Sequence, residues 1–134
     1  MASVIDRAAT ALTRLGGVPF TSSDVELSVP SMTDDGFEVS LNVAGPRRFL
    51  VRYDNWHQVF DRAEDAYDCF EYGLSDSCRL RVTYRGTTPV EWCIERRQYG
   101  LWVPGRAIAR RLSPFWRSRR IVHRQNRVFT APGP

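Results

Sequence analysis

Residues 37–43 alternate strictly between apolar and polar side chains, and this pattern constrains the fold more than any other part of the chain. The odd-numbered positions from Phe37 to Val43 are apolar, whereas Glu38, Ser40 and Asn42 are polar. A period of two is typical of a β-strand that buries one face. Turn residues bound the segment on both sides, so the sequence predicts an antiparallel strand between two tight turns.

Neighbouring segments have the pattern of further short strands. Residues 24–29 alternate until Pro30 stops them, which predicts a strand near the edge of a sheet. A run from Arg47 to Tyr53 follows, and the tight turn Asp54-Asn55 leads into a run from Trp56 to Phe60. Strands joined by such short turns pair with their sequence neighbours, so an antiparallel meander is expected over residues 24–60.

The first helix is expected to begin at Ser3. Ser3 stands three residues before Asp6, which is the spacing of a capping box. Apolar residues then recur at helical spacing from Ile5 to Leu15, and Gly16 and Gly17 end the pattern.

A second helix is expected after Asp61, which stands three residues before Glu64 and is a suitable N-cap. Apolar residues at helical spacing follow, and Gly73 is expected to stop the helix. The opposite face carries only acids, namely Glu64, Asp65, Asp68 and Glu71. This helix should therefore present an acidic surface to solvent.

The alternating charges after residue 78 predict a β-hairpin around a five-residue loop, residues 86–90. The expected opposite pairs are Arg85 with Glu91 and Arg81 with Glu95 on one face, and Tyr84 with Trp92 and Val82 with Ile94 on the other. One face is then charged and the other apolar, whereas a four-residue loop would mix the two faces.

The chain beyond Glu95 is basic. Residues 96–134 contain ten arginines and no acid. Residues 99–103 have the pattern of a short strand, and a short helix is expected from about Arg106 to Leu112. Residues 119–130 form either a hairpin that turns at Gln125-Asn126 or an unstructured arm, and the sequence leaves both open.

Together these segments predict an α+β fold. The expected order is α-β-β-β-α-β-β, with a mainly antiparallel sheet of about five to six strands and one or two helices packed on one face. Residues 1–103 are expected to form a single domain, and residues 104–134 an arginine-rich segment that is docked or flexible. The order of elements is similar to that of small secretion chaperones, which implies binding of extended partner segments, although those proteins are usually acidic and share no motif with this chain.

Charge is distributed unevenly. Residues 1–78 hold six arginines and thirteen acids, whereas residues 79–134 hold thirteen arginines and two acids. Lysine is absent, which excludes Schiff-base catalysis and a phosphate-loop lysine. A genome rich in GC would produce the same preference for arginine.

No combination of residues identifies a catalytic site or a cofactor site. Cys69, Cys78 and Cys93 show no spacing that pairs them with His57 or His123 as nucleophile and base. The cysteines and histidines also lack the spacing of zinc ligands. We therefore expect a non-catalytic protein that holds no cofactor and no metal.

The sequence also indicates a compartment. No stretch approaches the roughly 20 apolar residues that a helix needs to cross a bilayer. Asp6, Arg7 and Arg14 interrupt residues 1–15, where a signal peptide would be apolar. We therefore expect a soluble, cytoplasmic protein with no membrane partner.

The leading hypothesis is a small, bacterial-type interaction protein that binds an acidic or extended protein partner through its sheet surface or its basic C-terminal segment. Arginines in that segment could instead pair with the acidic helix, within the chain or across a homodimer. A nucleic-acid-binding protein that uses residues 104–130 is the alternative, because arginines would contact phosphates and aromatic rings would stack on bases. Trp102 and Trp116 are expected to be exposed contacts. The candidate partner-binding residues are Arg106, Arg110, Arg111, Phe115, Trp116, Arg117, Arg119, Arg120, Arg124 and Arg127.

Overall fold

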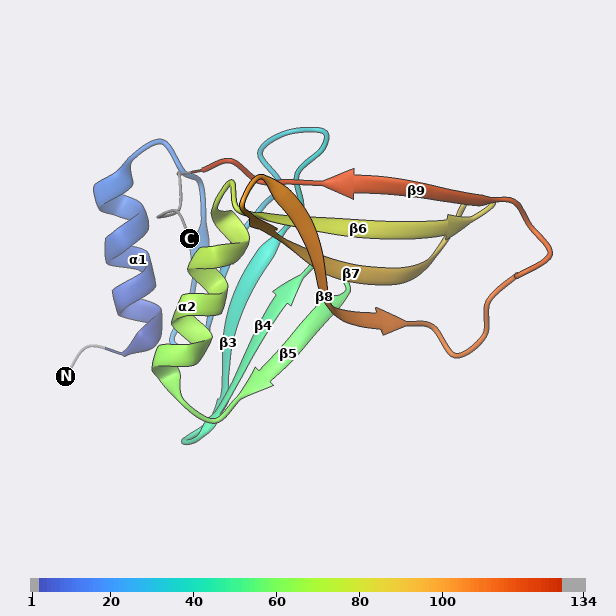
Figure 1. Cartoon of the computed structure of the whole chain (residues 1–134). Helices are drawn as coiled ribbons and strands as arrows, with labels where there is room; N and C mark the ends of the chain where they lie inside the picture. Colours follow the sequence, from blue (N-terminus) through green and yellow to red (C-terminus); the bar gives the residue numbers. More distant parts are fainter. Residues whose placement is uncertain (1–2, 129–134) are drawn as a thin grey trace.

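Two antiparallel sheets and two helices make up the fold, which we describe from a computed structural model for residues 3–128 (Figure 1). The helices are α1 (Val4–Leu15) and α2 (Ala63–Leu74). The first sheet has the order β1 (Thr21–Ser22), β2 (Glu26–Val29), β3 (Val39–Gly45), β4 (Arg48–Tyr53), β5 (Trp56–Phe60). The second has the order β8 (Leu101–Ala109), β7 (Thr88–Gln98), β6 (Cys78–Arg85), β9 (Arg119–Arg124).

The α+β class is therefore confirmed, and the main difference from expectation lies in the number of strands. The structure has nine strands in two sheets within residues 3–128, whereas a single sheet of about five to six was expected. In Figure 1 the helices cover the first sheet, and the second sheet extends away from them. The second sheet therefore has large surfaces that neither of the two described helices covers.

The meander in the first sheet is confirmed. Each strand from β2 to β5 pairs with its sequence neighbour. Tyr53 pairs with Trp56 across the predicted turn, and Asp54 adopts a positive φ of 55° that such a tight turn requires. Beyond β2 lies only the two-residue β1, so β2 is close to the edge, as expected.

The first helix begins as predicted, whereas the predicted cap of the second is wrong. The Ser3 hydroxyl accepts a hydrogen bond from the Asp6 amide at 3.1 Å, and the Asp6 carboxylate accepts one from the Ser3 amide. Arg62, not Asp61, is the N-cap of α2, and its side chain makes no capping hydrogen bond. The backbone is still extended at Arg62, so Asp61 lies one residue too early to reach the free amides of the first turn.

Gly73 does not stop α2, contrary to expectation. The helix continues through Leu74 and ends at Ser75, whose hydroxyl donates to the carbonyl of Tyr72 at 2.8 Å. Gly73 instead faces the ring of Tyr53, and a Cβ placed on it would lie 2.6 Å from Cζ of that ring. Glycine is required here because a strand side chain approaches the helix backbone closely.

The predicted register of the β6–β7 hairpin is wrong by two residues as far as Thr83, and by three at Tyr84 and Arg85 beyond a bulge. Arg81 pairs with Cys93 and Thr83 with Glu91, because the strands are joined by a two-residue turn at 86–87 and a bulge follows Thr83. A shift by two residues leaves each side chain on its predicted face. Arginines and glutamates therefore still share one face of the sheet, and the apolar side chains share the other.

The helix predicted from Arg106 to Leu112 is also wrong, because residues 101–109 form β8 along the free edge of β7. Ile108 lies opposite Trp92 in that pairing. The expected domain boundary after residue 103 thus falls inside a strand.

Neither proposal for residues 119–130 describes what the structure shows. Residues 119–124 form β9, which pairs with β6. Gln125 and Asn126 are then buried, and the Asn126 side chain bonds the backbone amide and carbonyl of Phe37 at 3.1 and 3.0 Å. Residues 129–134 lie outside the described part of the chain.

Candidate anion-binding groove

A groove of about 410 Å³ crosses the charged face of the second sheet near the β6–β7 turn. We call it the arginine groove. Its lining residues are Arg81, Thr83, Arg85, Val90, Glu91, Ala109, Arg110, Ser113, Arg119 and Ile121. Four guanidinium groups and one carboxylate thus share a small surface, and four strands contribute to it.

Strand register explains why these side chains meet. Thr83 of β6 lies opposite Glu91 of β7 on one side and opposite Ile121 of β9 on the other. Arg85 lies opposite Arg119. Directly opposite residues of antiparallel strands point to the same face with their Cβ atoms about 5 Å apart, so the arginines converge on the groove.

The groove carries unbalanced positive charge. Among residues 3–128, Arg85, Arg110 and Arg119 form no ion pair, and Arg81 lies 3.8 Å from the carboxylate of Glu91. Like charges directly opposite one another destabilise a sheet. An anion between Arg85 and Arg119 would remove that repulsion, and planar guanidinium groups bind carboxylates and phosphates with paired hydrogen bonds.

On the other half of the same face, a carboxylate neutralises part of the positive charge. The buried carboxylate of Glu95 lies 2.5 Å from Nε of Arg79 and 3.2 Å from Nη1 of Arg81. His123 lies 3.7 Å from the same carboxylate, and partial burial together with the charge of Arg79 lowers the pKa of its imidazole below 6.5. His123 is therefore mainly neutral near pH 7, so it adds little positive charge to this half of the face.

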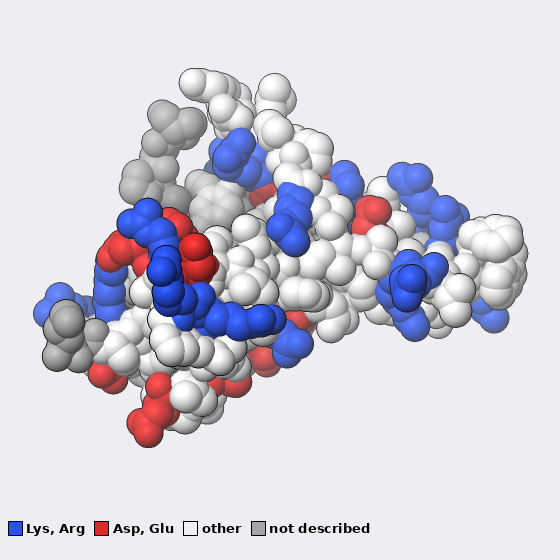
Figure 2. Space-filling model, turned by 90° about the horizontal axis from the view of Figure 1, so that it is seen from below, with Lys and Arg blue, Asp and Glu red and all other residues white. Residues whose placement is uncertain are grey.

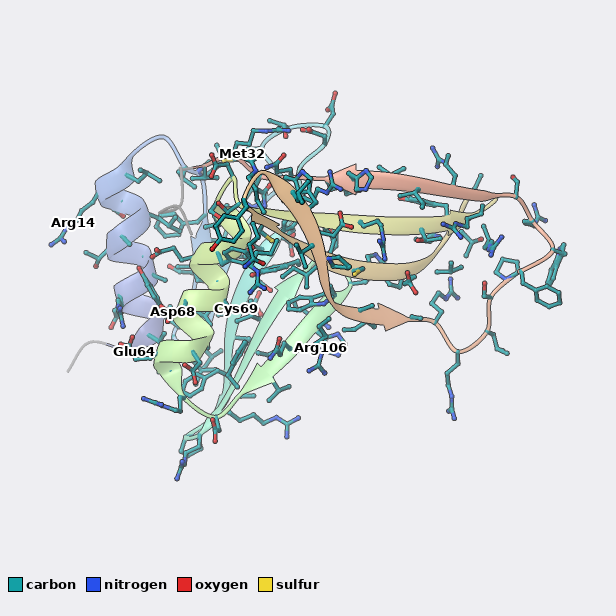
Figure 3. The ribbon with its side chains drawn as sticks, in the orientation of Figure 1. Arg14, Met32, Glu64, Asp68, Cys69 and Arg106 are labelled. Atoms are coloured by element: carbon teal, nitrogen blue, oxygen red, sulfur yellow. The ribbon has the colours of Figure 1, made fainter. Side chains whose placement is uncertain are left out.

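The ten residues predicted to bind a partner do not form one site. Arg110 and Arg119 line the arginine groove, whereas Arg111, Phe115, Trp116 and Arg117 lie in the loop between β8 and β9. The other four lie elsewhere. Arg120 stacks over Tyr84 on the opposite face, Arg124 donates to the Asp34 carbonyl, and Arg127 pairs with Asp35. Arg106 lies on β8 near β5, where its carbonyl accepts a hydrogen bond from the indole of Trp56 (Figure 3).

Sequence reasoning missed Arg81 and Arg85 as groove residues, because the predicted register paired both with glutamates. One signal was present: β6 carries Arg79, Arg81 and Arg85 on one face, whereas β7 supplies only two acids. Trp102 is also not the free contact that was expected, because it is half-buried with the guanidinium groups of Arg79 and Arg97 over its ring.

Comparison with known protein families, curated proteins and solved structures gives no match. The arginine groove must therefore be interpreted from its chemistry alone. Within residues 3–128, no group of three or more His, Cys, Asp or Glu side chains is arranged to hold a metal ion. Neither described helix has both the length and the apolar character needed to cross a membrane.

The acidic face of α2 lies far from the arginine groove. In Figure 3, Glu64 and Asp68 project from α2, at the opposite end of the molecule from the β8–β9 loop. Glu64 pairs with Arg7 of α1 at 2.5 Å. Intramolecular pairing between this helix and the groove arginines is therefore not seen in the described residues.

A second pocket, of about 230 Å³, lies between α1 and α2. Apolar side chains line it, and Glu71 is the only ionisable carboxylate or base among them. It lacks the several converging polar groups that orient a small-molecule ligand.

The cysteines are poorly suited to nucleophilic chemistry. Burial raises the pKa of the Cys69 thiol to about 11, and burial also raises the pKa of Cys78 and Cys93. The Cys69 thiol lies 3.3 Å from the hydroxyl of Tyr53, and the Cys93 thiol bonds backbone carbonyls. The thiolate is the nucleophile, so raised pKa values leave little reactive species near pH 7.

We expect all three thiols of the folded protein to react slowly with Ellman's reagent at pH 8. The raised pKa values keep the thiols protonated at this pH, and in the unfolded chain they fall to about 8.5, where reaction is fast. Absorbance of the released thiolate, measured with and without guanidinium chloride, tests this. A single thiol that reacts rapidly in the folded protein would contradict it.

Proposed function

We propose that the protein is a non-catalytic cytoplasmic binding protein whose arginine groove holds an acidic, extended segment of a partner protein. The observation that carries the proposal is the convergence of Arg85, Arg110 and Arg119 on one groove without ion pairs within residues 3–128. Guanidinium groups at an exposed surface are ordinarily paired or separated, because like charges in close contact cost free energy.

The dimensions of the groove suit an extended chain. It crosses four neighbouring strands from Ala109 to Ile121, and three strand spacings span about 14 Å. An extended segment of about four residues covers that distance. Thr83 and Ser113 add hydroxyl groups that can donate hydrogen bonds to backbone or carboxylate oxygens of such a segment.

Nucleic acid fits the arrangement less well. A phosphate backbone is followed by a continuous track of basic side chains. In this protein Arg119 and Arg120 point to opposite faces, and Arg124 and Arg127 are engaged by the loop at Asp34 and Asp35.

One further feature supports the proposal. Cys69, Cys78 and Cys93 are all unpaired, which is the normal state of thiols in a reducing cytoplasm. The acidic face of α2 on a second copy of the chain is an alternative occupant of the groove, which would bind as a folded helix instead of an extended segment. A dimer that dissociates when hexaglutamate is added, measured by analytical ultracentrifugation, would identify that partner.

Replacing both Arg85 and Arg119 with glutamine is expected to weaken binding of a fluorescent hexaglutamate peptide at least about tenfold. Each charge-assisted hydrogen bond contributes about 1.5 kcal/mol or more, and 1.4 kcal/mol corresponds to a factor of ten. Fluorescence anisotropy at low salt measures the affinity. The Glu91→Gln variant should bind more tightly, because it removes the only carboxylate from the groove.

The matched control is the double variant Arg47→Gln/Arg48→Gln. It removes the same charge from exposed positions at the β3–β4 turn, and its affinity should stay within about threefold of the unmodified protein. Equal losses in the two double variants would show a non-specific charge effect and refute the groove. Tighter binding of a single-stranded oligonucleotide than of hexaglutamate would favour nucleic acid instead.

A further inference from the structure

The loop between β8 and β9, residues 110–118, forms the end of the molecule that lies furthest from the helices (Figure 1). We call it the tip loop. Three large apolar side chains project from it into solvent: Leu112 is 86% exposed, Phe115 76% and Trp116 72%. No large apolar side chain within residues 3–128 is more exposed than Leu112. The two aromatic rings pack edge to face, with their centroids 5.4 Å apart.

Positive charge borders these apolar side chains. Arg111 and Arg117 lie in the tip loop itself, and both are exposed. Figure 2 shows uncharged atoms at this end of the molecule with basic atoms beside them, whereas acidic atoms gather around the helices. An exposed apolar cluster with a basic border matches the surface of an anionic bilayer, where apolar groups enter the interface and arginines contact lipid phosphates.

The tip loop is held in this arrangement before any ligand binds. At one end the Arg110 amide donates to the Val90 carbonyl, and at the other the Gly86 amide donates to the Ser118 carbonyl, both at 2.8 Å. Two further backbone bonds lie inside the loop, from Phe115 to Ser113 and from Arg117 to Pro114. A loop ordered in advance loses little conformational entropy when it docks.

We propose that the tip loop attaches the protein to anionic membranes, with Leu112, Phe115 and Trp116 inserted into the interface and Arg111 and Arg117 on the lipid phosphates. The expectation of no membrane partner rested on the absence of a spanning segment, which this mode of attachment does not need. A bilayer fits better than nucleic acid, because Leu112 has no aromatic face on which a base could stack. The five side chains of this proposal do not line the arginine groove, although Arg110 and Ser113 of the same loop do.

Co-sedimentation with vesicles of phosphatidylcholine and phosphatidylglycerol tests the attachment. The unmodified protein should pellet with these vesicles and much less with pure phosphatidylcholine. The variant Leu112→Ser/Phe115→Ser/Trp116→Ser should lose at least about tenfold in vesicle affinity, because each buried apolar side chain favours insertion. Its circular dichroism and its hexaglutamate affinity should be unchanged, since the three side chains are exposed and outside the groove.

The matched control is Tyr99→Ser/Leu101→Ser, which removes two exposed apolar side chains from the β7–β8 turn and should leave vesicle binding unchanged. Quenching of tryptophan fluorescence by brominated lipid should occur in the unmodified protein and disappear in Trp116→Phe. The proposal is overturned if the anionic vesicles do not pellet the protein, or if the triple variant binds them normally. Loss of oligonucleotide binding instead of vesicle binding in that variant would assign the tip loop to nucleic acid.

Discussion

Replacing Glu95 with alanine is expected to destabilise the protein by about 3 kcal/mol, because it leaves the partly buried Arg79 without its counter-ion and Arg81 with only the more distant carboxylate of Glu91. The Glu95 side chain is only 6% exposed, and it accepts hydrogen bonds from Arg79 and Arg81 on the neighbouring strand. Its removal leaves positive charges on one face of β6 with nothing between them. A melting temperature lower by about 10 °C, measured by circular dichroism or calorimetry, would agree with this estimate.

The control is Glu91→Ala, on the same strand and the same face. Glu91 is 38% exposed and its nearest guanidinium nitrogen is 3.8 Å away, so its loss should cost less than about 0.5 kcal/mol. A similar decrease in melting temperature for the two variants would contradict the prediction, because it would mean that a buried ion pair stabilises the protein no more than an exposed one.

Gly73→Ala is expected to destabilise the protein by about 2 kcal/mol, although alanine is the better helix former. Alanine in a helix interior gains about 1 kcal/mol over glycine, whereas overpacking a core typically costs up to about 3 kcal/mol. The new methyl group would overlap the ring of Tyr53. That ring cannot easily move away. It stacks on the ring of Trp56 with the two centroids 4.7 Å apart, and its hydroxyl donates a hydrogen bond to the Cys69 carbonyl.

Denaturant unfolding of Gly73→Ala and Gly45→Ala measures this effect. A Cβ on Gly45 would meet Arg48 at an ordinary 3.7 Å, so the second variant should differ from the unmodified protein by less than about 1 kcal/mol. If Gly73→Ala proved more stable than the unmodified protein, the conclusion that the Tyr53 ring leaves no room for a Cβ at position 73 would be wrong.

Local patterns predicted the meander and the two helices, because each of those elements is encoded within a few residues. The alternation at residues 37–43 and the capping box at Ser3 needed no knowledge of distant contacts. By contrast, β8 forms where a helix was predicted at Arg106–Leu112. Residues 101–109 become a strand because they pair with the free edge of β7, and the helix or strand propensity of the residues themselves does not reveal such an edge.

Two of the four groove arginines were predicted from the sequence as binding residues. The other two were missed because the hairpin register was predicted wrongly. The predicted register used Glu91 to neutralise Arg85, whereas the structure places Glu91 opposite Thr83 and Arg85 opposite Arg119. Charge pairing alone did not distinguish two registers that keep the same faces. Arg110 and Arg119 were recognised as candidate binding residues, and Arg81 and Arg85 were assigned to structural ion pairs.

The contact between Asn126 and Phe37 has a consequence for the order in which the chain folds. The side chain of Asn126 bonds the backbone of Phe37 and the carbonyl of Gly73, which are 89 and 53 residues away. During synthesis, Phe37 just before β3 and Gly73 in α2 therefore wait for residue 126 to leave the ribosome before these backbone groups find their partner. Contacts of such long sequence separation slow folding and leave strand edges open meanwhile. This chain should therefore depend more on chaperones while it is being translated than after its release.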